Sequence, residues 1–245
     1  MNSLTLLQVA IIFIAAGVVK GISGMGLPTL SMALLTLVMP PSSAAALMIL
    51  PSLATNVAQC FGPHLRALLI CLWPMWLSLL LVTLYSPIPD LSSAGNGAKL
   101  PLGSVLIVYG IFGLVRPALP DLRDWALSVG AVVGICSGLL TASTGVFIMP
   151  MVPFLQTQKF GKDEMMQALG ISFTLATVAL TLRLGIFNVT SFTFEPIQLA
   201  VSLVTAFVGL WLGARIRNRL NPLAFQRALY TVFFLLGSLT VAKSL

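Results

Sequence analysis

Charged residues are scarce in this chain: only 8% of its 245 residues are Asp, Glu, Lys or Arg, whereas 58% are hydrophobic. A soluble domain carries about 25% charged residues. This composition excludes a soluble globular protein, and its hydrophobicity excludes a disordered chain. At about 20 residues per crossing, the length accommodates roughly seven to nine membrane segments. We therefore predict an all-α polytopic membrane protein embedded in a lipid bilayer.

Cysteine, histidine and acidic residues are also few: the chain has three Cys, one His and six Asp and Glu. Cys60, Cys71 and Cys136 lie apart within apolar runs and form no CxxC or Cys/His cluster. We therefore expect no metal site and infer no disulfide. With no nucleophile–base set and no cofactor loop visible, we expect neither an enzyme nor a cofactor. The net charge of +7 does not indicate a nucleic-acid partner, because no soluble domain exists to carry the basic surface.

Apolar segments alternate with short connectors rich in proline, glycine and charge, and they cover residues 4–39, 43–61, 67–85, 101–115, 125–155, 165–182, 196–214 and 223–242. The first and fifth are too long for one simple helix. Each contains a cluster of glycine and small hydroxyl residues midway, at 17–28 and at 134–145. We predict a helix break at each cluster.

The two halves of the chain look like copies of one another. A shift of 117 residues places Gly17 on Gly134 and Gly21 on Gly138. A shift of 122 residues then places Leu-Ala-Thr at 53–55 on the same three residues at 175–177. The shared order of a broken segment, a segment with Leu-Ala-Thr and two further spans indicates an internal repeat within one membrane domain.

The basic residues predict how the two repeats, 1–119 and 120–245, are oriented. If every apolar segment crossed the bilayer, basic residues would divide five against seven between the two sides. If each broken segment returns to its starting side, one side keeps only Lys99, Arg183 and Lys243. The other side then holds nine: Arg66, Arg116, Arg123, Lys159, Lys162, Arg215, Arg217, Arg219 and Arg227. Because basic residues collect in cytoplasmic loops, we favour the re-entrant arrangement, with both termini outside.

In that arrangement each repeat crosses the bilayer three times, so the second repeat is inverted relative to the first. Inverted repeats with discontinuous helices are the architecture of secondary transporters. Non-helical backbone inside a bilayer is tolerated only against protein or a water-filled cavity. We therefore expect the two broken segments to face each other inside the protein.

The breaks carry groups that suit a small oxyanion. A glycine-rich break frees backbone N–H groups, and a half-helix that begins there directs its positive end at the gap. Lys20 lies close to the first break, and a cation inside the membrane is a functional hypothesis by default, although a lysine can also extend to an interface. The candidate substrate-binding residues at the breaks are Lys20, Ser23, Gly24, Gly26, Thr141, Ser143 and Thr144.

Further candidate residues lie on the segments that follow the breaks. Thr55 and Asn56 follow the first break, and Thr177 occupies the place of Thr55 in the second half. These side chains can line a substrate path or can hydrogen-bond between helices. For the repeated pair Thr55 and Thr177 we favour the lining; for Asn56 both interpretations stand. Gly209 and Gly213, spaced as GxxxG, are predicted to pack helices.

At these residues the sequence resembles the TauE/SafE family of sulfite and organosulfonate exporters. The resemblance is carried by the break at 17–28, its second copy at 134–150, the segment 44–59 and the ending 209–216 with a final span. It implies export of a small sulfur-containing oxyanion across the bacterial inner membrane, by alternating access with the anion bound between the two breaks. Where the family often has a run of glycines, this chain has Ser-Gly-Met-Gly in the first copy and Thr-Ala-Ser-Thr in the second.

Two other functions remain open alongside transport. One is a membrane-embedded assembly or accessory protein, in which the repeats only pack helices. The other is an anion channel, which differs from a transporter in that its flux does not saturate. Under the transport hypothesis the partners are the anion and the bilayer, and the same residues are compatible with a homo-oligomer.

Overall fold

The protein is described by a computed structural model over residues 3–89, 91, 95–115, 117–185 and 196–244. All regular elements of these residues are helices, which confirms the predicted all-α fold. The α-helices are α1 (Ser3–Ser23), α2 (Leu27–Leu35), α3 (Pro41–Cys60), α4 (Leu65–Tyr85), α5 (Lys99–Val115), α6 (Ala126–Thr144), α7 (Met151–Thr157), α8 (Lys162–Arg183), α9 (Pro196–Ile216) and α10 (Pro222–Ala242). Three short 3₁₀ helices are η1 (Gly95–Ala98), η2 (Arg123–Trp125) and η3 (Arg217–Arg219).

Seven of the described helices are long and apolar enough to cross a membrane: α1, α3, α4, α6, α8, α9 and α10. The apolar helix α5 is shorter, at 17 residues. Helices α2 and α7, of nine and seven residues, are too short to cross. The chain is therefore an integral membrane protein, and each of its two long apolar segments consists of a full-length helix followed by a short one.

The first break lies within the predicted range 17–28, at its C-terminal part, and the second begins only at Gly145, the last residue of its predicted cluster. Helix α1 continues through Gly17 and Gly21, and the chain leaves the helix only at Gly24 and Gly26, with φ angles of 79° and 100°. These are left-handed conformations that glycine adopts without strain. Helix α6 likewise continues to Thr144. The candidates Thr141, Ser143 and Thr144 therefore lie in the last turn of α6, before the break at 145–150.

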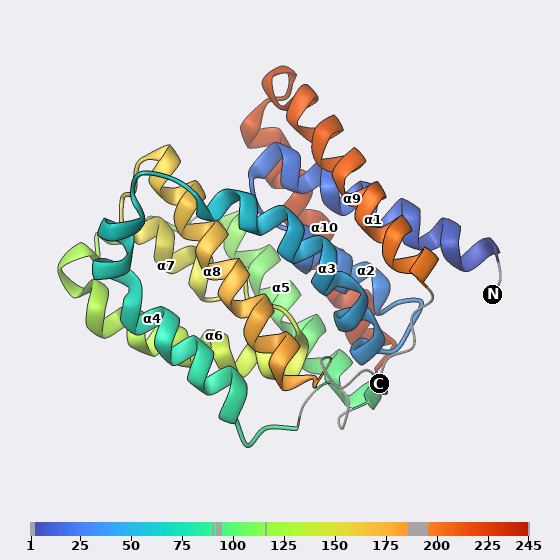
Figure 1. Ribbon diagram of the computed structural model, residues 1–245, viewed down its shortest axis with the longest axis horizontal. Coiled ribbons are helices and arrows are strands. Elements are labelled where there is room, and N and C mark those ends of the chain that lie inside the picture. Colours follow the sequence, from blue (N-terminus) through green and yellow to red (C-terminus); the bar gives the residue numbers. More distant parts are fainter. Residues whose placement is uncertain (1–2, 90, 92–94, 116, 186–195, 245) are drawn as a thin grey trace.

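The more N-terminal glycines of each cluster stay helical because they serve helix packing. A Cβ on Gly17 would lie 2.3 Å from the carbonyl oxygen of Ala206, so no side chain fits between α1 and α9. Gly209 packs against Gly17, and Gly213 against Gly21, which confirms the predicted packing role of this GxxxG pair. From the first contact to the second, the residue number increases by four in each helix, so α1 and α9 are parallel, as Figure 1 shows.

The matching glycines of the second half make the equivalent contact. A Cβ on Gly134 would lie 2.2 Å from the carbonyl oxygen of Met75, and one on Gly138 would lie 3.0 Å from that of Leu79. Helices α6 and α4 are therefore also a parallel, closely packed pair. Each broken segment thus packs its long helix against a helix of the other half.

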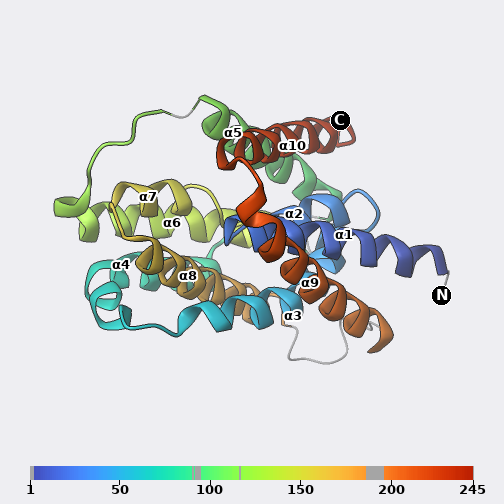
Figure 2. The same cartoon turned by 90° about the horizontal axis from the view of Figure 1, so that it is seen from above.

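Two antiparallel pairs complete the packing between the halves. Helices α5 and α10 meet where a Cβ on Gly103 would lie 2.8 Å from the carbonyl oxygen of Gly237. Helices α3 and α8 meet where a Cβ on Gly170 would lie 2.5 Å from the Cβ of Gln59. In Figures 1 and 2, α10 lies beside α5, and α2 folds back along α1.

Loops and helix termini gather at two ends of the bundle. At one end, Gln59 Nε2 donates to the carbonyl oxygen of Gly24 at 3.2 Å, and Gln167 Nε2 donates to that of Cys60 at 2.9 Å. At the opposite end, the guanidinium of Arg183 donates to the carbonyl oxygens of Thr83 at 2.8 Å and Ile88 at 2.6 Å. The last contacts fasten the end of α8 to the end of α4.

Most described basic residues lie at the first of these ends, which we call the basic end: Arg66, Arg123, Lys159, Lys162, Arg215, Arg217, Arg219 and Arg227. Lys99, Arg183 and Lys243 lie at the opposite end, as do the beginning of α1 and the end of α10. Arg116, which the sequence places with the first group, lies outside the described residues.

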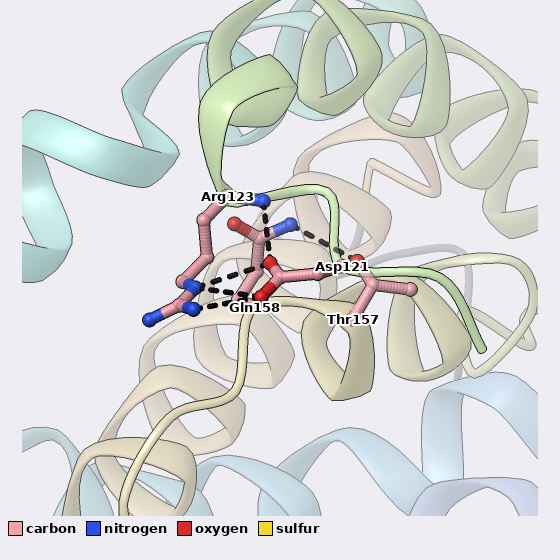
Figure 3. A network of polar contacts seen from close by, with 4 residues as sticks. All are labelled: Asp121, Arg123, Thr157 and Gln158. Atoms are coloured by element: carbon pink, nitrogen blue, oxygen red, sulfur yellow. Dashed lines mark hydrogen bonds and ion pairs between the residues drawn. The ribbon is translucent and has the colours of Figure 1, made fainter.

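The second broken segment returns to the end at which it starts (Figure 3). The backbone N–H of Leu122, just before η2, donates to the carbonyl oxygen of Thr157 at the end of α7, with a distance of 3.4 Å. Figure 3 shows the neighbouring Asp121 and Arg123 beside Thr157 and Gln158. Beside this contact, Arg123 Nη2 and Asp121 Oδ2 form an exposed ion pair at 2.7 Å. Hydrogen bonds from the Arg123 side chain and backbone lower the pKa of the Asp121 carboxyl below its ordinary value. The pair lies in the connection before α6, beside the end of α7.

Candidate functional site

Lys20 is buried within the helices and bonds to two of the predicted site residues. Its side chain is only 1% exposed. Lys20 Nζ donates to Thr55 Oγ1 at 3.1 Å and to Asn56 Oδ1, so the lysine of α1 reaches across to α3. The described residues place no carboxylate in an ion pair with this ammonium. A lysine without an ionic partner inside the membrane part of a protein is costly, which makes Lys20 a candidate functional residue.

The same face of α3 also holds the first break. Gln59 Nε2 donates to the Gly24 carbonyl oxygen, and a Cβ on Gly24 would lie 2.5 Å from Met166 Sδ of α8. Asn56 Nδ2 is buried and has no hydrogen-bond partner among the described residues. Lys20 and Gly24 thus both contact the same part of α3, where Asn56 lies, and Gly24 also adjoins α8.

Hydroxyl groups at the breaks bond to the chain around them. Ser23 Oγ donates to the carbonyl oxygens of Val19 and Met25, both at 2.7 Å. In α6, the hydroxyls of Thr141, Ser143 and Thr144 donate to carbonyl oxygens of their own helix. An anion here would accept from these hydroxyls only after they turned away from the helix.

Thr177 does not join the Lys20 cluster directly. It is fully buried in α8, and its Oγ1 donates to the carbonyl oxygen of Phe173 at 2.7 Å. One turn earlier, Thr174 Oγ1 lies 3.2 Å from Cys60 Sγ of α3. Thr177 therefore lies on a helix that contacts α3, but its hydroxyl is used within α8.

A cavity of about 230 Å³ lies where the two broken segments adjoin. Its wall includes Ser23 and Gly26 at the first break and Ile148 at the second. Nearby, the side chain of Met32 in α2 reaches within 3.3 Å of the position that a Cβ on Gly145 would occupy. Of the predicted site residues, the cavity therefore brings together Ser23 and Gly26.

The remaining predicted residues lie away from this cavity wall: Lys20, Gly24, Thr55, Asn56, Thr141, Ser143, Thr144 and Thr177. The candidate site thus has two parts. The first is the cavity on one side of the α1 terminus, and the second is the Lys20 cluster on the other side, facing α3.

Several polar residues of the cavity wall escaped the sequence analysis. They are Arg217 of η3, Gln156 of α7, Gln226 of α10, and the tyrosines Tyr109 and Tyr230. Arg217 was interpreted only as an orientation signal. The packing of Gly21 against Gly213 could have indicated Arg217. Because α1 and α9 are parallel, one turn beyond this contact the first break at Gly24 lies level with Arg217.

Comparison with known families agrees with this architecture. The sequence model of the family described as "Sulfite exporter TauE/SafE" matches residues 9–240, nearly the whole chain. The chain belongs to the TauE/SafE family. No curated protein and no solved structure matches it.

Membership in the TauE/SafE family confirms the resemblance seen in the sequence and identifies the chain as a membrane transporter, not an enzyme. The matched range begins within α1 and ends within α10, so it includes both broken segments, the cavity wall and the Lys20 cluster. The family description names sulfite export. Both parts of the candidate site are therefore features of a TauE/SafE membrane domain.

Proposed function

We propose that this TauE/SafE protein is a secondary transporter that exports small sulfur-containing oxyanions, such as sulfite or organosulfonates, by alternating access. The observation that carries the proposal is the cavity between the broken segments, whose wall, among the residues that the structure describes, contains a single charged side chain, that of Arg217. A cavity at the junction of discontinuous helices is where secondary transporters bind their substrates. An anion entering it would meet Arg217 together with the polar groups of Ser23 and Gln156.

The helix packing supports an inverted repeat with halves 1–119 and 120–245. A two-fold axis in the membrane plane would exchange α1 with α6 and α9 with α4, which turns the parallel pair α1–α9 into the parallel pair α6–α4. The same axis would turn α3 into α8 and α5 into α10, and each of those pairs is antiparallel. All four pairings are thus the ones an inverted repeat requires.

The charge distribution supports a cytoplasmic basic end and periplasmic termini in a bacterial inner membrane. Arg217 and Leu220, at the connection between α9 and α10, place one side of the cavity at the basic end. In this orientation the cavity lies at the cytoplasmic side of the protein. A transporter waiting in that state would load its anion from the cytoplasm, which is what export requires.

The Lys20 cluster supplies positive charge beside the cavity. Lys20 precedes Ser23 by less than one helical turn, so the lysine that bonds to α3 and the serine of the cavity wall belong to the same end of α1. When protonated, Lys20 would make the potential at this end of α1 more favourable to an anion. In an alternating-access cycle the protein has a second state, open to the opposite side, in which the second repeat would line the binding cavity as the first repeat does here. We assign the second-half residues to that state: Thr141, Ser143, Thr144 and Thr177.

Flux into proteoliposomes tests the proposal. Purified protein should move sulfite or a small sulfonate with saturation kinetics, and Arg217→Gln should lower the flux while leaving the melting temperature close to that of wild type. Flux that rises linearly with concentration would favour a channel. Absence of flux, together with no anion-dependent thermal stabilisation, would favour a non-transporting accessory protein.

A further inference from the structure

The Lys20 cluster points to a role for protons in the proposed function, on which this inference rests. We propose that Lys20 is a proton-binding site linked to the anion site: it holds a proton while the anion is bound and releases that proton when the anion leaves. Proton and anion then each strengthen the binding of the other, because such a coupling is reciprocal. Three observations support it: the burial of Lys20, its neutral partners and an unused amide group of Asn56.

No carboxylate of the membrane segments can fix a positive charge on Lys20. The six acidic residues of the chain all lie outside its apolar segments, as Asp90, Asp121, Asp124, Asp163, Glu164 and Glu195. Within the described residues, Lys20 Nζ donates to two neutral oxygens, Thr55 Oγ1 and Asn56 Oδ1. Burial among neutral groups disfavours the charged form of an amine. Release of the proton also leaves no unpaired negative charge behind, which it would do beside a carboxylate.

Asn56 can serve both protonation states of Lys20. Its Oδ1 accepts from the ammonium, while its Nδ2 is buried and has no hydrogen-bond partner among the described residues. A neutral amine has a lone pair that accepts a hydrogen bond. Rotation of the Asn56 amide by about 180° would exchange its two ends, so that Nδ2 could donate to this lone pair. The unused Nδ2 therefore has a role in the deprotonated state.

Lys20 is also placed where its charge acts on the first break. It precedes Ser23 of the cavity wall by less than one turn of α1. Within one turn of Asn56 on α3, Gln59 Nε2 donates to the Gly24 carbonyl oxygen at 3.2 Å, so the same two helices are joined at the break. Across about one helix diameter, a unit charge changes the affinity for an anion by about tenfold at an effective dielectric constant of about 20.

Few other titratable groups surround Lys20. On α3 the thiol of Cys60 is close enough to interact with Lys20 electrostatically, and it contacts Thr174 Oγ1 at 3.2 Å. Helix α2 contains no titratable residue. The charged residues of α8, α9, η3 and α10 lie at the basic end, except Arg183 at the opposite end: Lys162, Asp163, Glu164, Arg215, Arg217, Arg219 and Arg227. The arginines among them stay charged at every pH considered below.

Calorimetry with methanesulfonate tests the linkage, because this anion keeps a single charge at each pH used. It would be titrated into the purified full chain at pH 6, 7, 8 and 9 in Bis-Tris and in Tris, buffers that differ in ionisation enthalpy. The affinity should fall by about tenfold from pH 6 to pH 9. The difference in heat between the buffers should show that a proton is taken up with the anion. Constant affinity, or no binding at any pH, would overturn the proposal.

Substitutions assign the proton to Lys20. Lys20→Arg keeps a permanent charge, so it should bind methanesulfonate as tightly at pH 9 as at pH 6 and take up no proton. Lys20→Met should bind about tenfold more weakly than wild type at pH 6, again without pH dependence. His64→Gln, at the single histidine, and Cys60→Ser are controls that should keep the wild-type dependence. A dependence that survives in Lys20→Met, or that is lost in either control, would overturn the assignment.

Thermal unfolding without any anion separates this inference from the transport proposal. In the unfolded chain Lys20 is in water and keeps its proton up to about pH 10. The melting temperature of wild type relative to that of Lys20→Met should therefore rise from pH 6 to pH 9, where only the folded protein releases the proton. A constant difference would overturn the proton site even if the protein transports anions. A rising difference and proton-linked binding, with no flux into proteoliposomes, would support the proton site and contradict the transport proposal.

Discussion

Lys20 is the residue at which sequence and structure agree most closely. A lysine inside an apolar segment stands out without any structure, since burying an ammonium costs several kcal/mol. The structure adds its partners, Thr55 and Asn56, and the absence of a carboxylate partner among the described residues. Two neutral oxygens stabilise the charge less than a carboxylate would, so the ammonium remains available to attract an anion.

Replacing Lys20 by Met should separate function from stability. Met fills a similar volume, and the loss of two hydrogen bonds is offset by the removal of a buried charge, so the free energy of unfolding should change by less than about 2 kcal/mol. Flux should fall by about ten- to a hundredfold, which corresponds to one lost charged interaction of about 1.5–3 kcal/mol. Proteoliposome flux and thermal unfolding measure the two quantities. Lys159→Met, at an exposed position, is the control; wild-type flux in Lys20→Met would show that the lysine only packs helices.

Asp121 provides a test of pH dependence outside the membrane segments. Arg123 lowers the pKa of its carboxyl, so the ionised form stabilises the folded protein. This contribution is fully present above the ordinary pKa of about 4 and is lost as the pH falls through the lower folded-state value. Asp121→Asn should therefore melt slightly below wild type at pH 7, and the two melting temperatures should converge as the pH falls below the ordinary pKa of about 4. A gap that stays constant from pH 7 down to the lowest pH at which both proteins remain folded would contradict the ion-pair account.

The site could be predicted from sequence only where its residues stand out locally. Ser23 and Gly26 belong to a visible break, and both line the cavity. Arg217 and Tyr109 come from distant elements and look like ordinary loop and helix residues until the chain is folded. Their placement depends on helix registers, which the hydropathy pattern does not encode.

At the scale of elements, the glycine clusters perform two tasks that look alike in sequence. Gly24 and Gly26 allow left-handed backbone at the break, whereas Gly17 and Gly21 remain helical and allow α9 to approach. The broken segments could be predicted from the sequence, and the first break lies within the predicted range 17–28, whereas the second begins at the last residue of its predicted cluster. Distinguishing the two tasks requires the packing partner, because both favour the smallest residue.

Alanine substitutions should show how much the close contact between α1 and α9 contributes to stability. A Cβ on Gly21 would lie 2.3 Å from the backbone oxygen of Leu210, so Gly21→Ala must push α1 and α9 apart. We expect a fall in the free energy of unfolding of about 1–3 kcal/mol, typical of overpacking. Gly97→Ala is the control, because a Cβ there meets nothing within 4 Å. Thermal unfolding in detergent compares the two, and equal melting temperatures would refute the close contact.

At the scale of the whole molecule, the few charges become informative through their positions. The described basic residues concentrate at one end of the bundle, and the contact between Leu122 and Thr157 returns the second broken segment to that end. Charge counting predicted this grouping because loops are short and each basic residue stays near a helix terminus. The pairing of α1 with α9 and α4 with α6 could not be predicted, since it joins segments far apart in the chain.

Cysteine labelling tests the proposed membrane orientation. Pro40 follows the first broken segment and Lys159 follows the second, and both are exposed. In a background without the native cysteines, Pro40→Cys should react with an impermeant maleimide in intact cells, and Lys159→Cys should react only after permeabilisation. Labelling of both positions from the same side would contradict the inverted arrangement.

The central claim is that the protein carries an anion by alternating access, and solute counterflow tests it most directly. Proteoliposomes loaded with unlabelled butanesulfonate would be diluted into a trace of the labelled anion. The account predicts a transient accumulation of label above equilibrium, which wild type shows and Lys20→Met lacks. A monotonic rise to equilibrium, or no uptake at all, would contradict a carrier mechanism.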